Sequence, residues 1–293
     1  MSIITEAFIM HPAFFLAAVF LFSLMVGSFL NVVILRLPVM MKKEWREECC
    51  EFLELKTEEK QQTSAFNLVV PRSRCPNCQH LITALENIPV ISYLFLKGRC
   101  KECGTRISLR YPAIELLTAL ASVSVAYYFG VTIQTLFAII LTWALIALSF
   151  IDIDEQLLPD NITLPFLWLG IALNSFTDWG FTTSQSSLLG AILGYGSLWT
   201  VYIIFKLVTG KEGMGHGDFK LLAMLGAWLG WIHLPVIIIM SSLVGAVIGI
   251  AMIVLKSRDR TIPIPFGPYL AIAGWVSMFW GNYLISSYLN LML

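Results

Sequence analysis

The sequence predicts an all-α protein that crosses a membrane about eight times and carries a small cytoplasmic zinc-knuckle domain after its first helix. Of its 293 residues, 57% are hydrophobic and only 13% are charged, which is far from the balance of a soluble domain. The apolar residues form long runs without a charge, and two Cys-x-x-Cys pairs lie in the polar segment that separates the first run from the others. A soluble protein with an apolar core would not tolerate so many uninterrupted runs.

Five uncharged spans set the expected number of crossings. One crossing takes about 20 apolar residues, so a span of about 35 residues is expected to fold as two helices. We expect helices over about 12–35, 111–130, 131–151, 162–177 and 186–207, a sixth from 218, a seventh after 235 and an eighth that ends the chain. The uncharged spans are Leu116–Ile151, Asn161–Thr177, Trp179–Phe205, Leu221–Leu255 and Thr261–Leu293.

The basic residues predict the orientation. All 19 Lys and Arg residues fall within 36–110, 206–220 and 256–260, and by the positive-inside rule these segments face the cytoplasm. Both termini then lie outside, and the N-terminal apolar run, which no basic residue precedes, is expected to be a retained helix. We therefore expect a first transmembrane helix over 1–35, a cytoplasmic domain over 36–111 and a seven-helix membrane domain over 112–293.

The cytoplasmic domain contains a candidate metal site. Its first part, 42–62, is rich in Glu and Lys and is expected to form a solvated helix without chemistry. The second part holds Cys75, Cys78, Cys100 and Cys103, two pairs whose spacing can place four thiolates around Zn²⁺. Two disulfides are the alternative, but a reducing cytoplasm disfavours them. Four cysteine ligands leave no open position, so a structural zinc ion is expected.

The segment 213–220 differs most from a plain membrane helix. Asp218 opens an apolar run, and Gly213, Gly215 and Gly217 precede it, where the backbone can approach a ligand closely or adopt a positive φ. We expect Gly215 and Gly217 to let an extended substrate approach. An ionisable residue at the mouth of a membrane helix is a candidate functional residue. Taken alone, Asp218 could equally be a helix N-cap.

A second acidic cluster, 152–155, ends another apolar run at the same membrane face. Asp152 and Asp154 lie on nearly opposite sides of a continuing helix, so only one of them can face Asp218. We choose Asp152 because it lies deeper, and we interpret Asp154 and Glu155 as solvated loop charges. Two carboxylates that share a proton can activate water and protonate a leaving amine, which is the chemistry of an aspartic protease without a metal.

Other hydrolase and nucleotide sites are not indicated. None of the four histidines begins a His-Glu-x-x-His pattern, and no Gly-x-Ser-x-Gly elbow is present. The glycines before Asp218 are not surrounded by the strand–turn–helix unit of a nucleotide-binding loop.

The combined motifs resemble those of the bacterial type IV prepilin peptidases, membrane aspartyl proteases of the Gly-x-Gly-Asp class. The resemblance covers nearly the whole chain and includes both cysteine pairs. It is carried by Gly27-Ser28-Phe29-Leu30-Asn31, Arg36-Leu37-Pro38, Arg110-Tyr111-Pro112 with Glu115, Asp152 through Pro159-Asp160, Gly215-His216-Gly217-Asp218-Phe219-Lys220 and Pro263 to Pro268.

This resemblance implies that Asp152 and Asp218 are the catalytic pair and that 112–293 is the protease domain. It implies a multi-pass protein of the bacterial inner membrane that cuts prepilins and pseudopilins on the cytoplasmic side, after a glycine that ends a short basic leader. Family members with the zinc-knuckle domain usually also methylate the new N-terminal amine with S-adenosylmethionine. No methyltransferase motif is visible in the sequence, so the residues of that activity are not named.

Two other classes of protein remain open at this stage. A proton-coupled transporter could relay protons through Asp152 and Asp218. Against it, no internal repeat is visible and the carboxylates lie at one membrane face instead of at mid-bilayer. An assembly scaffold would leave both acidic clusters unexplained. The expected partners are the pilin-like substrates and the lipid bilayer, without nucleic acid, and the oligomeric state is not predicted.

Overall fold

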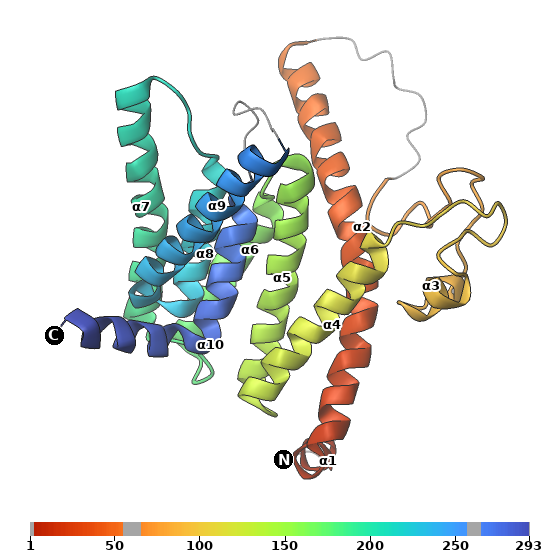
Figure 1. Cartoon of the computed structure of the whole chain (residues 1–293), viewed down its shortest axis with the longest axis horizontal. Coiled ribbons are helices and arrows are strands. Elements are labelled where there is room, and N and C mark those ends of the chain that lie inside the picture. The colour runs from red at the N-terminus through yellow and green to blue at the C-terminus, as the bar shows by residue number, and fades with distance from the viewer. Residues whose placement is uncertain (1–2, 55–65, 257–264, 293) are drawn as a thin grey trace. The chain divides into compact units, whose positions relative to one another are not determined.

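The computed structural model describes residues 3–54, 66–256 and 265–292, and the regular secondary structure within them is helical apart from two isolated β-bridges (Figure 1). The chain divides into two compact units, residues 1–131 and 132–293. The first unit contains α1 (Ile3–Met10), α2 (Pro12–Phe52), η1 (Leu85–Asn87), α3 (Ile91–Phe95) and α4 (Arg110–Phe129). The second contains α5 (Ile133–Glu155), α6 (Asp160–Phe176), α7 (Ser184–Thr209), α8 (His216–Leu229), η2 (Trp231–His233), α9 (Leu234–Lys256) and α10 (Gly267–Met292).

Five helices in the described ranges are long and apolar enough to cross a membrane. The structure thus supports five of the eight predicted crossings. They are α2, α4, α5, α7 and the span Trp231–Met252 that includes most of α9. α6 and α8 have 17 and 14 residues, fewer than the roughly 20 that span the hydrocarbon core. α10 has 26 residues, but its Trp, Tyr, Ser and Asn side chains lower its mean hydropathy.

The first long helix does not end at Arg36-Leu37-Pro38 as expected. α2 continues for 41 residues to Phe52 and contains Pro38 in its interior. The Glu- and Lys-rich segment from Lys42 is therefore the exposed end of α2 and not a separate helix, because strong helix formers and the pair Lys43–Glu47, at 3.8 Å, continue the same turns. Residues 55–62 of the predicted solvated helix lie outside the described residues.

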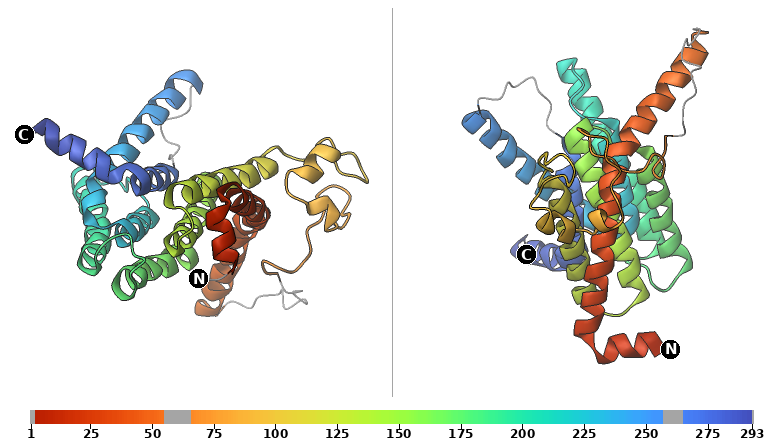
Figure 2. Two further views of the ribbon diagram at one scale, coloured as in Figure 1. Left: turned by 90° about the horizontal axis from the view of Figure 1, so that it is seen from below. Right: turned by 90° about the vertical axis from the view of Figure 1, so that its right-hand side faces the viewer.

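In the first unit α2 packs against α4 (Figure 2). A Cβ at Gly27 would lie 2.7 Å from Glu115 Cα, so the two backbones approach as closely as glycine allows. Asn31 Nδ2 donates to the carbonyl oxygen of Tyr111, at 3.2 Å, and to that of Gly27, also at 3.2 Å. Small residues of α2 thus allow close helix packing, and Asn31 bonds across to the neighbouring helix.

The second unit is built around the short helix α8, whose residues from Asp218 to Leu229 are buried except for Lys220. α8 packs against α6, α7 and α10 (Figure 1). Its last carbonyl groups are held by Asn174 Nδ2, which donates to Ala227 O at 2.8 Å, and by Ser187 Oγ, which donates to the same oxygen at 2.6 Å. These bonds fix the axial position of α8 and therefore the depth of Asp218.

Gly190 of α7 lies against Gly226 of α8, with no space for a side chain at either position. We expect Gly190→Val to separate the two helices and to lower the free energy of unfolding by about 1–3 kcal/mol or more, as overpacking does. Gly196→Val is the control on the same helix, because nothing lies within 4 Å of a Cβ at Gly196. Thermal unfolding of the purified variants in detergent measures the difference, and equal melting temperatures would contradict the packing described for α8.

Candidate functional site

Asp152 lies in the last turn of α5, with its side chain buried. The helix begins behind Thr132, whose hydroxyl accepts the Thr135 N–H at 3.1 Å, and ends at Gln156, whose left-handed backbone (φ 52°) returns its N–H to Asp152 O at 2.9 Å. Asp152 is 5% exposed, whereas Asp154 is exposed on the other side of the same turn. This is the difference in depth that the sequence predicts, although Asp154 and Glu155 belong to the helix and not to a loop.

Asp218 lies in the first turn of α8 and is 7% exposed. It is not the N-cap of the helix, because that position belongs to Gly215, which forms no side-chain cap. Its Oδ1 atom is buried, and no hydrogen-bond partner reaches it from the parts of the chain that the structure describes. A buried carboxylate oxygen without a partner is costly, so it is a strong candidate for contact with a reacting group.

The two aspartates occupy one small region of the second unit. The Gly267 N–H at the start of α10 donates to Asp152 Oδ2 at 3.0 Å. Leu158 packs beside both sites, since its side chain would contact a Cβ at either Gly217 or Gly267. The charge of Asp152 also acts on Asp218. The structure therefore brings the predicted pair together in an apolar setting.

The glycines before Asp218 do not adopt the positive φ that their sequence allowed. Gly215 has φ −77°, and neither Gly213 nor Gly217 is among the glycines with positive φ. A Cβ at Gly217 would lie 2.8 Å from Leu158 Cβ, so this glycine serves packing within the unit. A Cβ at Gly215 would have only Asp218 Oδ2 within 4 Å, at 3.7 Å, so space remains beside the carboxylate.

An ion pair beside this site was not predicted. Lys220 Nζ donates to both carboxylate oxygens of Asp160, at 2.7 Å each, and links the first turns of α8 and α6. Asp160 is the first residue of α6, behind Pro159 at the N-cap position. The pair holds the start of α8, and within the described ranges no cationic side chain pairs with Asp152 or Asp218.

The four cysteines of the first unit form one cluster, in which all four sulfur atoms lie within 4.8 Å of one another. Two of the separations are 3.8 Å (Cys75–Cys103) and 3.9 Å (Cys78–Cys100). A tetrahedron with Zn–S bonds of about 2.3 Å has S–S edges of about 3.8 Å, so the donors fit this metal. The cysteines are free thiols, and the separations are far from the roughly 2 Å of a disulfide bond.

The two cysteine pairs have the same backbone geometry, which explains how they form the cluster. In each, the first cysteine donates its N–H to the carbonyl five residues on, His80 at 2.9 Å or Thr105 at 2.8 Å. The fifth residue of each turn, Gln79 or Gly104, has positive φ and returns its N–H to the first cysteine's carbonyl. Both turns point their thiols inward in the manner of zinc knuckles.

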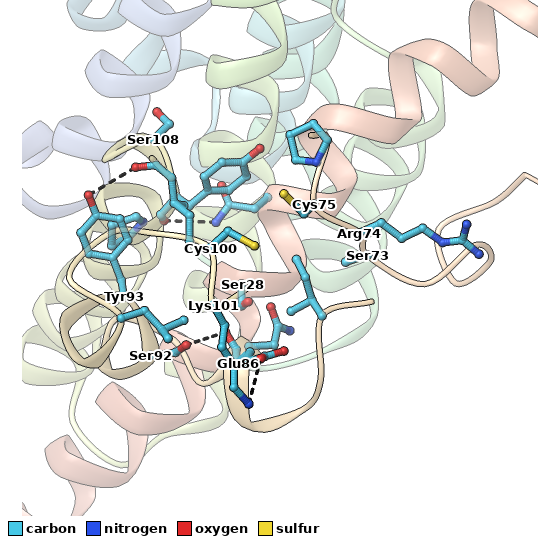
Figure 3. A pocket seen from close by; sticks show the side chains of 18 of the residues that line it. Ser28, Ser73, Arg74, Cys75, Glu86, Ser92, Tyr93, Cys100, Lys101 and Ser108 are labelled. Atoms are coloured by element: carbon cyan, nitrogen blue, oxygen red, sulfur yellow. Dashed lines mark hydrogen bonds and ion pairs between the residues drawn. The ribbon is translucent and has the colours of Figure 1, made fainter. Parts of the chain in front are cut away.

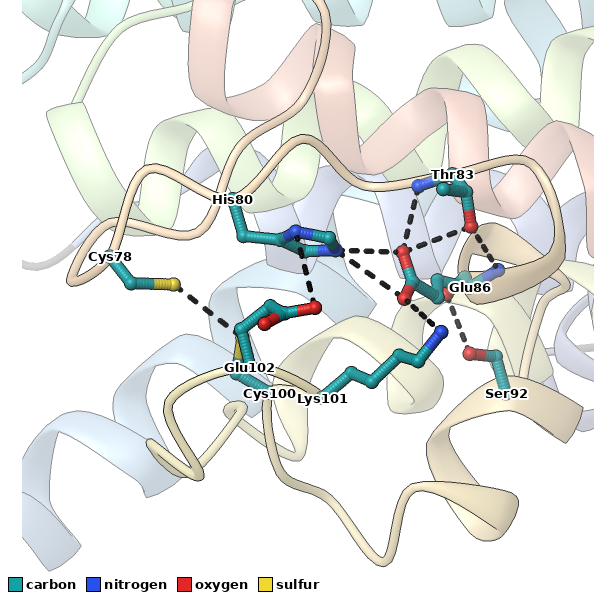
Figure 4. Close-up of polar contacts among 8 residues, drawn as sticks. All are labelled: Cys78, His80, Thr83, Glu86, Ser92, Cys100, Lys101 and Glu102. Atoms are coloured by element: carbon teal, nitrogen blue, oxygen red, sulfur yellow. Dashed lines mark hydrogen bonds and ion pairs between the residues drawn. The ribbon is translucent and has the colours of Figure 1, made fainter.

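Charged side chains surround the cluster (Figure 4). Glu86 accepts the Thr83 N–H at 2.9 Å and lies 3.1 Å from His80 Nε2 and 3.7 Å from Lys101 Nζ. The Thr83 N–H and then His80 lower the pKa of Glu86 to about 2. Glu86 is thus ionised and fully paired, and it ties the first knuckle to the second.

Comparison with known proteins identifies relatives of the whole chain. Residues 21–129 match the family model described as the bacterial peptidase A24 N-terminal domain, and residues 139–250 match that of the type IV leader peptidase family. Similar proteins include prepilin leader peptidase/N-methyltransferases of Aeromonas salmonicida, 54% identical over 96% of both chains, and of Pseudomonas aeruginosa, 54% identical over 96% of this chain and 95% of the relative. The one from Legionella pneumophila is 45% identical over 98% of this chain and 99% of its own. No solved structure matches the chain.

The cluster geometry predicts one bound zinc ion per chain. Cys75→Ser should lower the zinc content of the purified protein to about a tenth or less, because a hydroxyl is a poor replacement for a thiolate ligand. Cys49→Ser changes the same chemical group on the exposed end of α2, outside the cluster, and should leave the zinc content unchanged. Elemental analysis by mass spectrometry measures both; a wild-type protein without zinc, or an equal effect of both variants, would contradict the assignment.

Proposed function

The chain belongs to the type IV leader peptidase family, and we infer that it is the enzyme that removes the leader of prepilins and then methylates the new N-terminal amine. The observation that carries this conclusion is the identity of 54% with prepilin leader peptidase/N-methyltransferases over 96% of the chain. The two buried carboxylates of the second unit provide the chemistry of the first step. We include pseudopilins among the substrates.

Asp152 and Asp218 are the proposed catalytic pair. Two carboxylates in one apolar site share a proton, because both cannot be ionised at low cost. The ionised member takes a proton from water, and the water oxygen attacks the carbonyl carbon of the scissile peptide. The protonated member then gives its proton to the leaving nitrogen as the C–N bond breaks. Gly267 N–H holds Asp152 in place, and the unpartnered oxygen of Asp218 is available to water or substrate.

The substrate is proposed to approach beside Gly215. Space remains there next to Asp218 Oδ2, so an extended backbone can pass close to the carboxylates. Gly217 contributes indirectly, because it allows Leu158 to pack against α8 beside this region. Both glycines thus belong to the proposed substrate-binding region, one through contact and the other through packing.

The proposed topology retains all eight crossings. α8 is surrounded by other helices of the second unit, so it need not span the lipid by itself, and α6 and α10 are parts of the same bundle. From the distribution of basic residues we propose that the first turn of α8 and the cysteine cluster face the cytoplasmic side of the bacterial inner membrane. A pilin-like substrate is a membrane helix with a basic cytoplasmic leader, and its scissile bond reaches the same depth.

The N-methyltransferase activity needs a methyl donor, which we propose to be S-adenosylmethionine. The four cysteines would hold a structural Zn²⁺, whose role is to fix the two knuckles and the surrounding loops. The metal has no open coordination position in this arrangement, so the methyl transfer uses other residues of the chain.

The test is mass spectrometry of the N-terminus of a prepilin after incubation with purified enzyme and S-adenosylmethionine. Asp152→Asn and Asp218→Asn should each lower the rate of cleavage by at least about 10²-fold, as loss of an acid–base group does. Asp154→Asn, which makes the same change on the exposed side of α5, should cleave normally, and the wild-type product should carry one methyl group. Cleavage that survives Asp218→Asn would overturn the mechanism and would favour the transporter or the scaffold interpretation.

The two glycines predict different consequences of adding a methyl group. Gly215→Ala fits without a clash, so the melting temperature should stay unchanged while the KM for prepilin rises about tenfold, because the substrate loses space. Gly217→Ala displaces Leu158 and should lower both kcat and the melting temperature. Steady-state kinetics and thermal unfolding separate the two effects. Unchanged kinetics in Gly215→Ala would show that the substrate passes elsewhere.

A further inference from the structure

The first unit contains a cavity of about 520 Å³ that the peptidase chemistry does not use (Figure 3). Its walls come from α2, from the start of α4, and from the loops between the cysteine pairs. Most of its surface is apolar, and its lining includes Tyr93 and Tyr111 as well as the polar residues Ser28, Asn31 and Ser92. A cavity of this size and character is typical of a small-molecule site.

Glu115 of α4 supplies a buried carboxyl group to this cavity. Glu115 is 8% exposed, and its side chain accepts the Val90 N–H at 2.8 Å. Its backbone is fixed by the close approach of Gly27 on α2, so the carboxylate cannot withdraw by a shift of the helix. Among the described residues, no cationic side chain pairs with it.

Two other charged groups of the cavity wall, Glu86 and Arg36, have partners among the described residues. Glu86 is paired with His80 and Lys101. Arg36 donates to the carbonyl oxygens of Asn67, at 3.0 Å, and Pro71, at 2.7 Å. Glu115 therefore differs from Glu86, because the donor that holds it among the described residues is the neutral Val90 N–H. A buried carboxylate without a counter-ion is costly, and a cation bound in the cavity would remove that cost.

We propose that this cavity is the binding site of the methyl donor, and that Glu115 is the counter-ion of the donor's sulfonium group. The proposal rests on the proposed function, which requires such a donor. The apolar wall and the two tyrosine rings suit the adenosine part of the molecule, and the volume suits its size.

The charge balance of methyl transfer explains what Glu115 contributes. The lone pair of the pilin amine forms the new N–C bond, the S–C bond breaks, and its electron pair stays on sulfur. The amine gives up a proton to solvent. The sulfonium thus becomes a neutral thioether. The demethylated product, S-adenosylhomocysteine, therefore has one positive charge fewer than the donor. A fixed carboxylate binds the donor more tightly than the product and so favours exchange after each turnover.

The experiment compares the binding of S-adenosylmethionine and S-adenosylhomocysteine to the purified full-length protein by titration calorimetry. Wild-type protein should bind the donor more tightly than the product. Glu115→Gln, which keeps an acceptor for Val90 but removes the charge, should lower the affinity for the donor about tenfold and change that for the product by less than about twofold. Glu102→Gln is the control, because this exposed glutamate of the same cysteine module does not line the cavity.

Prepilin cleavage and zinc content show whether each variant is folded. If Glu115→Gln weakened the binding of both ligands equally, the assignment would be overturned. Unchanged donor affinity with a raised KM for the cleaved pilin would also overturn it, and would make Glu115 the site of the acceptor amine. A wild-type protein that binds the product at least as tightly as the donor would overturn it without any variant. Methylation that is absent from the wild-type protein would instead refute the proposed second activity.

Discussion

The hydrogen bond from Gly267 N–H to Asp152 Oδ2 is the interaction on which the arrangement of the second unit depends. It joins the end of α5 to the beginning of α10 at 3.0 Å, and it holds a carboxylate that is buried. Glycine is required at this point, since a Cβ would lie 2.7 Å from the same oxygen. A backbone donor holds the carboxylate in place but leaves it able to gain and lose a proton, which a salt bridge would oppose.

Glycine-mediated approach of helices places an acid in both units. Gly27 brings α2 against the backbone of Glu115, and Gly190 brings α7 against α8, the helix that carries Asp218. In a membrane the hydrophobic effect does not drive helices together, so small residues that allow close van der Waals contact determine which faces meet. The acidic side chains are consequently fixed by the packing of backbones, and their positions do not depend on long flexible side chains.

The parts of this structure that could be predicted from sequence are those with a regular spacing. The cysteine pairs predicted the cluster, and the helical period separated buried Asp152 from exposed Asp154. Composition alone misplaced the end of α2, because the polar segment after Pro38 is itself rich in helix formers. The partner of Asp160 and the exposure of Glu115 to a cavity arise from tertiary contacts across 60 and 25 residues, which no local pattern records.

Burial in an apolar setting has different consequences for Asp218 and Glu115, because their neighbours differ. Asp218 lies near another carboxylate, so the pair is most stable when one member holds a proton, which suits proton transfer to and from a reacting peptide. Glu115 accepts the neutral Val90 N–H, which fixes its orientation without supplying a positive charge, and this suits the proposed binding of a cation. The identity of the neighbouring group, more than the depth of burial, thus decides whether a buried acid serves as a proton donor or as a counter-ion.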